Sequence, residues 1–354
     1  MNKNAAIFLS SVSLCIYAMD SLDLPSGSVN TQSWLLDDVI LRAANNRELA
    51  FDYAMFARGL NVQESRDFAE KIKKIPLIER VSFVSVCQLT DDAFAHLIYA
   101  LYQRIKVREL DVSFSPKLGS DDARMKLLSK LLSSMPSVTI FKFNASGLGC
   151  AGYKSVCALT NAFGVAALEE IDLSFCELAR MGDSRSFSCL MRTLGGSALK
   201  VLRLRGNAMN AFSAEQVYSL AGVVVTAMHL KTLDVASNGI GLPGKLSAWG
   251  VFTEALALSG LEELNVSNNW LDASSDELWN GFMCAISCMK KLKRLDMRGN
   301  GLSSMSDDRR LKLVEALIRC PSYPVLVLKK QDNFNKCWTR LVEQENRLKI
   351  VFEE

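Results

Sequence analysis

The sequence contains little histidine and lacks the short motifs that carry most catalytic chemistry. Its two histidines, His96 and His229, each lie beside apolar residues with no evident partner, although a general base or a metal site most often uses this side chain. No GxxxxGK(S/T), HExxH or nucleophile-elbow pattern occurs. These absences predict a protein that is not an enzyme and that needs no cofactor and no metal.

The sequence also lacks a strong net charge and a paired cysteine motif. Its 41 basic and 38 acidic residues give a formal net charge of +3, which is too small to indicate a nucleic-acid or membrane partner by long-range electrostatics. The ten cysteines form no CxxC pair and mostly lie in apolar helical stretches. They predict buried, reduced thiols of an intracellular, cytoplasmic protein. Cys284 and Cys288 lie one helical turn apart, but without a second pair they do not predict a metal site.

The N-terminus carries a short apolar run, residues 5–19, preceded by Lys3. The run is too short to span a membrane as a helix. It is consistent with a buried first helix, which we favour. The alternative is that residues 1–19 are an organellar or secretory targeting segment.

A repeat of about 31 residues is the strongest signal in the chain. The pattern L-x-x-L-x-L-x-x-N-x-L occurs as LKVLRLRGNAM (199–209), LKTLDVASNGI (230–240), LEELNVSNNWL (261–271) and LKRLDMRGNGL (292–302). Weaker copies begin at 78, 107, 138 and 168, so successive copies start 29, 31, 30, 31, 31, 31 and 31 residues apart. A constant period of this kind indicates stacked structural units.

Each position of the pattern has a physical role. Alternation places Leu233 and Val235 on one face of a short strand, pointing inward. The asparagine at position nine turns the chain, and its amide can satisfy backbone groups of neighbouring turns. The second half of each unit has helical spacing. Its predicted N-termini are capping boxes at Ser213–Gln216 and Ser274–Glu277, with Ser306 before a third helix.

This pattern resembles the leucine-rich-repeat superfamily, and the long unit resembles its ribonuclease-inhibitor-like class. That class includes Ran GTPase-activating proteins, tropomodulins and the sensor regions of immune receptors. The resemblance covers about residues 78–330. It implies an α/β solenoid, a horseshoe with a parallel concave β-sheet and convex helices. We expect a helical N-terminal cap over 1–77, repeats over 78–322 and a C-terminal cap over 323–354.

A glycine motif in one repeat is similar to a dinucleotide-binding fingerprint. Gly147, Gly149 and Gly152 form GxGxxG between an expected strand and an expected helix. The same motif recurs three units later at Gly239, Gly241 and Gly244. Because it recurs at the same phase, we interpret these glycines as turn residues of the repeat.

The outward strand positions are the expected binding surface. Position five alternates between acidic residues and basic or neutral ones, so it is either a self-neutralising charge ladder or a surface matched to a charged partner. Arginine and aromatic side chains are common interface anchors. The predicted partner-binding residues are Phe114, Phe175, Lys200, Arg203, Arg205, Asp234, Trp270, Arg294, Asp296 and Arg298.

The sequence therefore predicts a non-catalytic protein-interaction scaffold or adaptor, a subunit of a larger assembly. It would hold its partner on the concave face or on the rim of ascending loops. One alternative is a regulator of a small GTPase, although the chain ends in LKIVFEE and lacks the long acidic tail of the Ran-activating proteins. A second alternative is association with RNA or a ribonucleoprotein through the basic strand clusters.

Overall fold

The computed structural model describes residues 39–51, 62–83, 89–102, 106–242, 246–329 and 349–353. All of them belong to one compact unit, Val39–Glu354. The possible targeting segment 1–19 and most of the C-terminal cap expected over 323–354 lie outside the described residues.

The unit is built on a single sheet whose strands follow one another in sequence order. Each strand pairs in parallel with the next, and equivalent repeat positions face each other, as Leu202 faces Leu233 and Leu264 faces Leu295. The strands of this sheet are β1 (Glu48–Phe51), β2 (Arg80–Phe83), β3 (Glu109–Asp111), β4 (Ile140–Lys142), β5 (Glu170–Asp172), β6 (Val201–Arg203), β7 (Thr232–Asp234), β8 (Glu263–Asn265), β9 (Arg294–Asp296), β10 (Val325–Lys329) and β11 (Ile350–Glu353).

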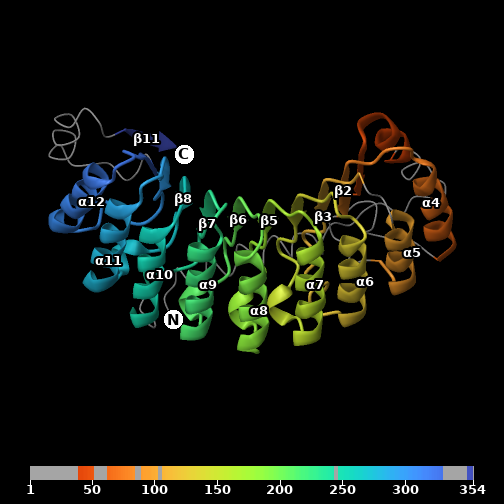
Figure 1. The fold of residues 1–354 in the computed structure, drawn as a ribbon, viewed down its shortest axis with the longest axis horizontal. Helices are drawn as coiled ribbons and strands as arrows, with labels where there is room; N and C mark the ends of the chain where they lie inside the picture. The colour runs from red at the N-terminus through yellow and green to blue at the C-terminus, as the bar shows by residue number, and fades with distance from the viewer. Residues whose placement is uncertain are drawn as a thin grey trace, which may run out of the picture. The chain divides into compact units, whose positions relative to one another are not determined.

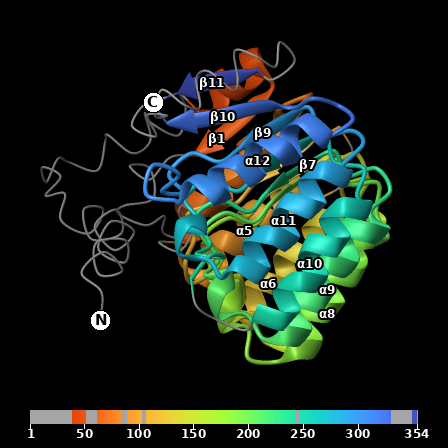
Figure 2. The same ribbon diagram turned by 90° about the vertical axis from the view of Figure 1, so that its left-hand side faces the viewer.

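A helix follows most strands and returns the chain to the start of the next one. A further helical segment, residues 39–46, precedes β1. The remaining helices lie side by side on one face of the sheet, as Figure 1 and the end-on view of Figure 2 show. They are α4 (Val62–Lys74), α5 (Asp91–Leu101), α6 (Asp122–Ser133), α7 (Tyr153–Val165), α8 (Ser184–Gly195), α9 (Ala214–Thr226), α10 (Leu246–Leu258), α11 (Asp276–Cys288) and α12 (Asp307–Arg319). This arrangement confirms the predicted leucine-rich-repeat solenoid with a parallel sheet and outer helices.

The core lies between the sheet and the helices. The leucines at positions four and six, such as Leu202 and Leu204, are fully buried. On the helical side Leu220 and Val217 of α9 are equally inaccessible. Because one strand and one helix cannot bury these side chains alone, each repeat depends on its neighbours for stability.

The asparagines at position nine join successive repeats through buried hydrogen bonds. The backbone N–H of Asn207 donates to Oδ1 of Asn238 (2.7 Å), and Nδ2 of Asn238 donates to the carbonyl oxygens of Leu204 (3.0 Å) and Val235 (2.9 Å). Asn269 repeats this pattern one unit later. The predicted role of the position-nine amide is therefore confirmed.

The earlier repeats replace this asparagine with smaller groups. The thiol of Cys176 donates to the carbonyl oxygen of Phe143 (3.0 Å), and the hydroxyl of Ser146 donates to that of Val112 (2.9 Å). Each replacement keeps the bond to position six of the preceding repeat but cannot make the full set that an amide makes.

Two of the three predicted helix starts are correct. Ser213 and Gln216 form a capping box, and the hydroxyl of Ser306 accepts from the backbone N–H of Arg309. The predicted box at Ser274–Glu277 is wrong. The cap of α11 is Ser275, which accepts from the backbone N–H of Leu278, because the Ser274 hydroxyl donates instead to the carbonyl oxygen of Leu271 (2.7 Å).

The recurring glycines are turn residues that touch the next repeat. A Cβ atom on Gly149 would lie 1.9 Å from the carbonyl oxygen of Glu177, and one on Gly241 would lie 2.0 Å from that of Trp270. Only glycine permits this approach of backbone to backbone. The interpretation of these motifs as repeat turns is therefore correct.

The sheet runs through both predicted cap boundaries. β1 precedes residue 77 and pairs with β2, while β10 and β11 follow residue 322 and extend the sheet beyond β9. The described cysteines form no disulfide, yet the prediction that they are buried is wrong for Cys150, Cys284 and Cys288, which are exposed. These three lie on outward positions of a 3-10 turn and of α11, where a helical pattern alone does not separate a thiol from the core.

Candidate functional site

The face of the sheet opposite the helices presents positions three, five and seven of each repeat. Acidic residues at position five have a local structural role there. The carboxylate of Asp172 accepts a hydrogen bond from the backbone N–H of Ser174 (2.9 Å), and that of Asp234 accepts one from Ala236 (2.9 Å). Asn265 makes the same bond to Ser267 (3.0 Å). These side chains end the strand by satisfying the next free backbone donor.

The basic residues on this face are bound by glutamates of the preceding strand. Lys200 contacts Glu169 at 2.7 Å, and Arg203 forms an ion pair with Glu170. In this pair of repeats longer glutamates at positions two and three reach the cations. The carboxylates of Asp172 and Asp234 accept from backbone N–H groups instead.

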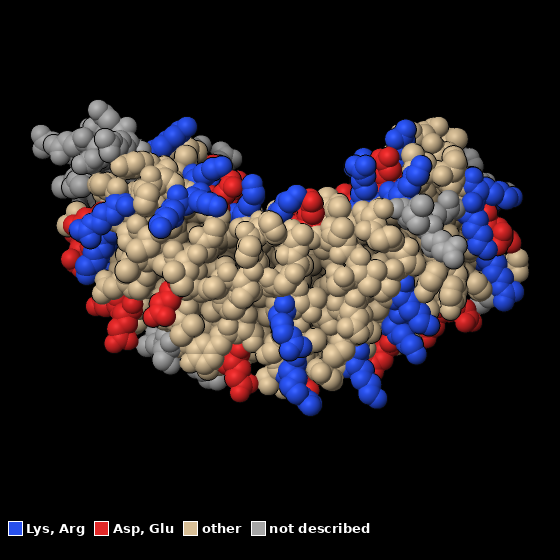
Figure 3. Space-filling view, viewed as in Figure 1, with Lys and Arg blue, Asp and Glu red and all other residues tan. Residues whose placement is uncertain are grey.

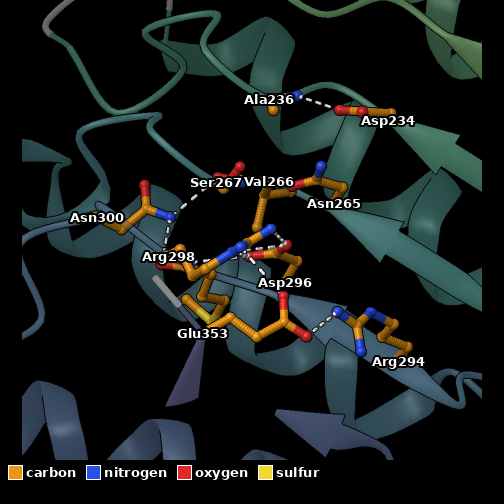
Figure 4. A network of polar contacts seen from close by, with 11 residues as sticks. Asp234, Ala236, Asn265, Val266, Ser267, Arg294, Asp296, Arg298, Asn300 and Glu353 are labelled. Atoms are coloured by element: carbon orange, nitrogen blue, oxygen red, sulfur yellow. Dashed lines mark hydrogen bonds and ion pairs between the residues drawn. The ribbon is translucent and has the colours of Figure 1, made fainter. Parts of the chain in front are cut away.

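The basic group at the C-terminal end of the sheet is also neutralised within the chain. The carboxylate of Glu353 accepts from Arg294 (2.7 Å) and lies 3.1 Å from Arg298, which also contacts Asp296 at 2.6 Å (Figure 4). The hydrogen bond from Arg294 and the charge of Arg298 lower the pKa of Glu353. Arg294, Asp296 and Arg298 therefore form a network that fastens β11 to β9.

The position-five carboxylate of Asp234 lies in surroundings that disfavour its ionised form. Burial raises its pKa, while the N–H of Ala236 and the charges of Arg205 and Arg203 act in the opposite direction. Asp234 was predicted as a site residue, and the structure places it at a partly buried strand end.

In the turns after β4 to β9 two positions, eight and ten, include residues with the left-handed backbone conformation, and the turn after β3 has one such residue. Position eight does so at Phe114, Ala145, Phe175, Gly206, Ser237, Asn268 and Gly299. Position ten does so at Gly147, Glu177, Ala208, Gly239, Trp270 and Gly301. A positive φ is unfavourable for a bulky side chain. Phe114, Phe175 and Trp270 are therefore unusual occupants of positions where small residues recur.

Arg205 differs from the other predicted basic residues. It is exposed, and no carboxylate of the described residues lies within 4.0 Å of its guanidinium group. The guanidinium lies 5.9 Å from the ring centroid of Phe175, over the ring. The ring in turn lies against Gly206, where a Cβ would be 2.3 Å from two ring atoms.

The ten predicted residues therefore do not form one site. Phe175 and Arg205 are in contact. Lys200 directly precedes β6, and Arg203 and Asp234 lie on β6 and β7. All three are engaged by their own neighbours. Arg294, Asp296 and Arg298 belong to the network with Glu353, and Trp270 lies in the turn after β8. Sequence reasoning missed Glu169, Glu170 and Glu353, although a carboxylate in the preceding repeat at a spacing of 31–33 residues was a usable signal for the first two.

Catalysis would need side chains that act together, and in the part of the chain that the structure describes the histidine with the most polar contacts is His96. His96 accepts from Arg66 at Nε2 (3.3 Å), and its Nδ1 lies 3.0 Å from the hydroxyl of Ser65, which is fully buried. This contact joins α4 to α5, and burial keeps the Ser65 hydroxyl away from solvent. Among the same residues no group of three metal-ligating side chains is present, and no helix is long and apolar enough to cross a membrane. A cavity of about 20 Å³ between α10 and α11 has an apolar lining that includes Trp249 and Trp279.

Charged side chains are unevenly distributed over the surface. In Figure 3 they gather toward the two ends and along the upper rim, while the middle, where α7 to α9 lie, is mostly uncharged.

Comparisons with known proteins identify the repeat. A family model described as leucine-rich repeat matches residues 226–244. The chain is similar in structure to the leucine-rich-repeat-containing protein LegL7 of Legionella pneumophila, with a TM-score of 0.55, 14% identity, and coverage of 85% of this chain and 89% of that one. The likeness shows a common fold.

Two further solved structures are more distant. Human 5T4 (trophoblast glycoprotein) matches with a TM-score of 0.39 and 16% identity over 63% of this chain and 70% of its own. The yeast complex of Rad7 and Elc1 matches with a TM-score of 0.32 and 11% identity over 100% of this chain and 98% of that one. No curated protein sequence is significantly similar to the chain.

Proposed function

Because the chain belongs to the leucine-rich-repeat superfamily, we propose that it is a non-catalytic scaffold that binds another protein, as one subunit of a larger assembly. The observation that carries the proposal is the placement of α4 to α12 on one face of the sheet. These helices bury the inner face and leave the other face, a row of backbone-paired strands, with mostly polar residues at positions three, five and seven of the repeats. A broad, rigid face of this kind suits recognition of a protein surface better than capture of a small molecule in a pocket.

The ion pairs on this face bear on its chemistry. Lys200, Arg203, Arg294 and Arg298 are neutralised by carboxylates of the chain. Such pairs weaken the case for association with RNA, which relies on free cations along a surface. They favour a partner that is recognised by shape and by a few local anchors.

Two matched valines test which face is used. Val201 lies on the sheet face in β6, and Val225 is exposed on α9. Tagged wild-type, Val201→Arg and Val225→Arg chains are used for affinity capture with quantitative mass spectrometry. The proposal predicts that specific partners are lost with Val201→Arg and retained with Val225→Arg. Loss with Val225→Arg alone would assign binding to the helices and contradict the proposal.

A further inference from the structure

We propose that Phe114, Phe175 and Arg205, here named the aromatic–arginine platform, bind a partner-protein segment that carries a carboxylate beside an aromatic or large aliphatic side chain. The inference rests on the proposed function and adds the chemistry of the partner. It is argued from backbone conformation, ring packing and charge.

The first argument is the backbone conformation of the two phenylalanines. Phe114 (φ 55°) and Phe175 (φ 56°) are left-handed, at the position where other repeats place Ala145, Gly206, Ser237, Asn268 or Gly299. Asparagine or glycine would adopt this turn conformation at a lower conformational free energy than phenylalanine. The turn itself therefore does not explain the two phenylalanines. Bulky residues held in this region occur preferentially at functional sites.

The second argument is the spacing of the two rings and the exposure of Phe114. Phe114 is 50% exposed. It lies two strands from Phe175, a separation of about 10 Å along the sheet at roughly 4.8 Å per strand. The residue between them at the same position is Ala145. A small residue between two aromatic ones leaves room for one apolar side chain of a partner between the rings.

The third argument is charge. Arg205 has no described carboxylate at ion-pair distance, whereas Lys200 and Arg203 on the same strand segment do. A guanidinium stacked on a ring keeps its N–H edge available, and that edge matches a carboxylate in two parallel hydrogen bonds. An acidic group beside an apolar side chain is therefore the complementary ligand.

A second arginine–aromatic pair supplies a matched control. The guanidinium of Arg185 in α8 lies 5.1 Å from the ring centroid of Tyr153 in α7. It is bound by Asp183 at 2.8 Å, and it lies on the helical side of the repeats. This pair has the same side-chain chemistry without the free cation and outside the sheet face.

The test begins with a display library of random twelve-residue peptides selected on the full chain. Enriched peptides are synthesised with a fluorophore, and their Kd is measured by anisotropy.

The platform variants are Arg205→Glu, Arg205→Ser, Phe114→Asn and Phe175→Asn. Serine and asparagine occur naturally at these repeat positions, as in Ser174 and Asn268, so these variants keep the fold. The control variants are Arg185→Glu and Tyr153→Asn, and circular dichroism melts verify folding.

We expect enriched peptides to combine Asp or Glu with Trp, Phe or Leu. Arg205→Glu should raise Kd at least about tenfold, and each phenylalanine substitution should raise it about fivefold or more, as loss of a charge-assisted contact or an aromatic anchor does. Arg185→Glu and Tyr153→Asn should leave Kd unchanged.

Each other outcome overturns the proposal. It fails if no peptide is enriched, if enriched peptides lack acidic residues, or if Kd is unaffected by Arg205→Glu. It also fails if the peptides do not bind but a labelled twelve-residue oligouridylate does, and Arg205→Glu abolishes that binding. The same conclusion follows if sedimentation velocity shows self-association that Arg205→Glu abolishes while the peptides do not bind. Partners lost with Val201→Arg but retained with Arg205→Glu would leave the scaffold function standing and remove only the platform. Partners insensitive to both would remove both.

Discussion

The side-chain oxygen of Asn238 accepts a hydrogen bond of 2.7 Å from the backbone N–H of Asn207, thirty-one residues earlier in the chain. The same asparagine donates to the carbonyl oxygens of Leu204 and Val235. All of these groups are buried, so a single side chain satisfies backbone groups of two repeats where water cannot replace it.

Substitution Asn238→Ala is therefore expected to be severely destabilising. It leaves one buried donor and two carbonyl oxygens short of a partner, which should lower the free energy of unfolding by about 3 kcal/mol or more. Urea titration followed by circular dichroism measures this change. The exposed Asn161→Ala of α7 is the control and should change stability by less than about 0.5 kcal/mol.

The thiol of Cys176 occupies the corresponding place two repeats before Asn238, next to Asn207. Replacing it with asparagine should allow the amide to bond the carbonyl oxygen of Phe143 and the neighbouring backbone donors. Cys176→Asn is expected to stabilise the chain by about 1 kcal/mol, while Cys176→Ala should destabilise it. If both substitutions lowered the urea midpoint by the same amount, the claim that the Cys176 thiol occupies the place of the position-nine amide would be wrong.

These two positions also show how far the sequence could predict the fold. Position nine of each repeat, its asparagines and their bonding role followed from a period that depends only on local chemistry. The cap of α11 did not, because Ser274 and Ser275 are adjacent serines and only the turn geometry decides which hydroxyl faces the helix.

The candidate site was less predictable for a related reason. Arg203 and Arg298 occupy positions five and seven of their repeats, which the sequence could give, but whether a cation is paired depends on a carboxylate brought near by stacking. Glu353 lies 59 residues from Arg294, outside any repeat spacing. Arg205 could be separated from its neighbours only once their partners were known.

Thiol reactivity should separate buried from exposed cysteines. Burial raises the pKa of Cys176 to about 12, and both Cys176 and Cys320 are inaccessible. The exposed Cys284 and Cys288 should be alkylated by iodoacetamide within minutes at pH 8, while Cys176 should react only in denaturant. Peptide mass spectrometry reports each site. Rapid labelling of Cys176 in the folded chain would contradict its place in the core.

Asp234 provides a test of pH dependence. Burial raises its pKa in the folded chain, so the folded state holds this proton more tightly than the unfolded state. Its ionisation therefore reduces stability as the pH rises from the unfolded pKa through the folded one. Asn265 shows that an amide accepts the same backbone bond, so Asp234→Asn keeps the hydrogen bond and removes the buried charge.

The expected result is that Asp234→Asn raises the melting temperature relative to wild type at pH 7, and that the difference shrinks toward pH 3. Asp172→Asn, at the same position of β5, is the matched control. A stabilisation by Asp234→Asn that grew as the pH fell would contradict the sign of this effect.

The account rests on the claim that a protein partner lies against the face of the sheet opposite helices α4 to α12. Photo-crosslinking measures this most directly, with benzoylphenylalanine placed either at Thr232 of β7 or at Tyr218, which is exposed on α9. The partner retained by wild type and lost with Val201→Arg is added to each labelled chain. We predict a crosslinked product from position 232 and none from position 218. A product from position 218 alone would contradict the account.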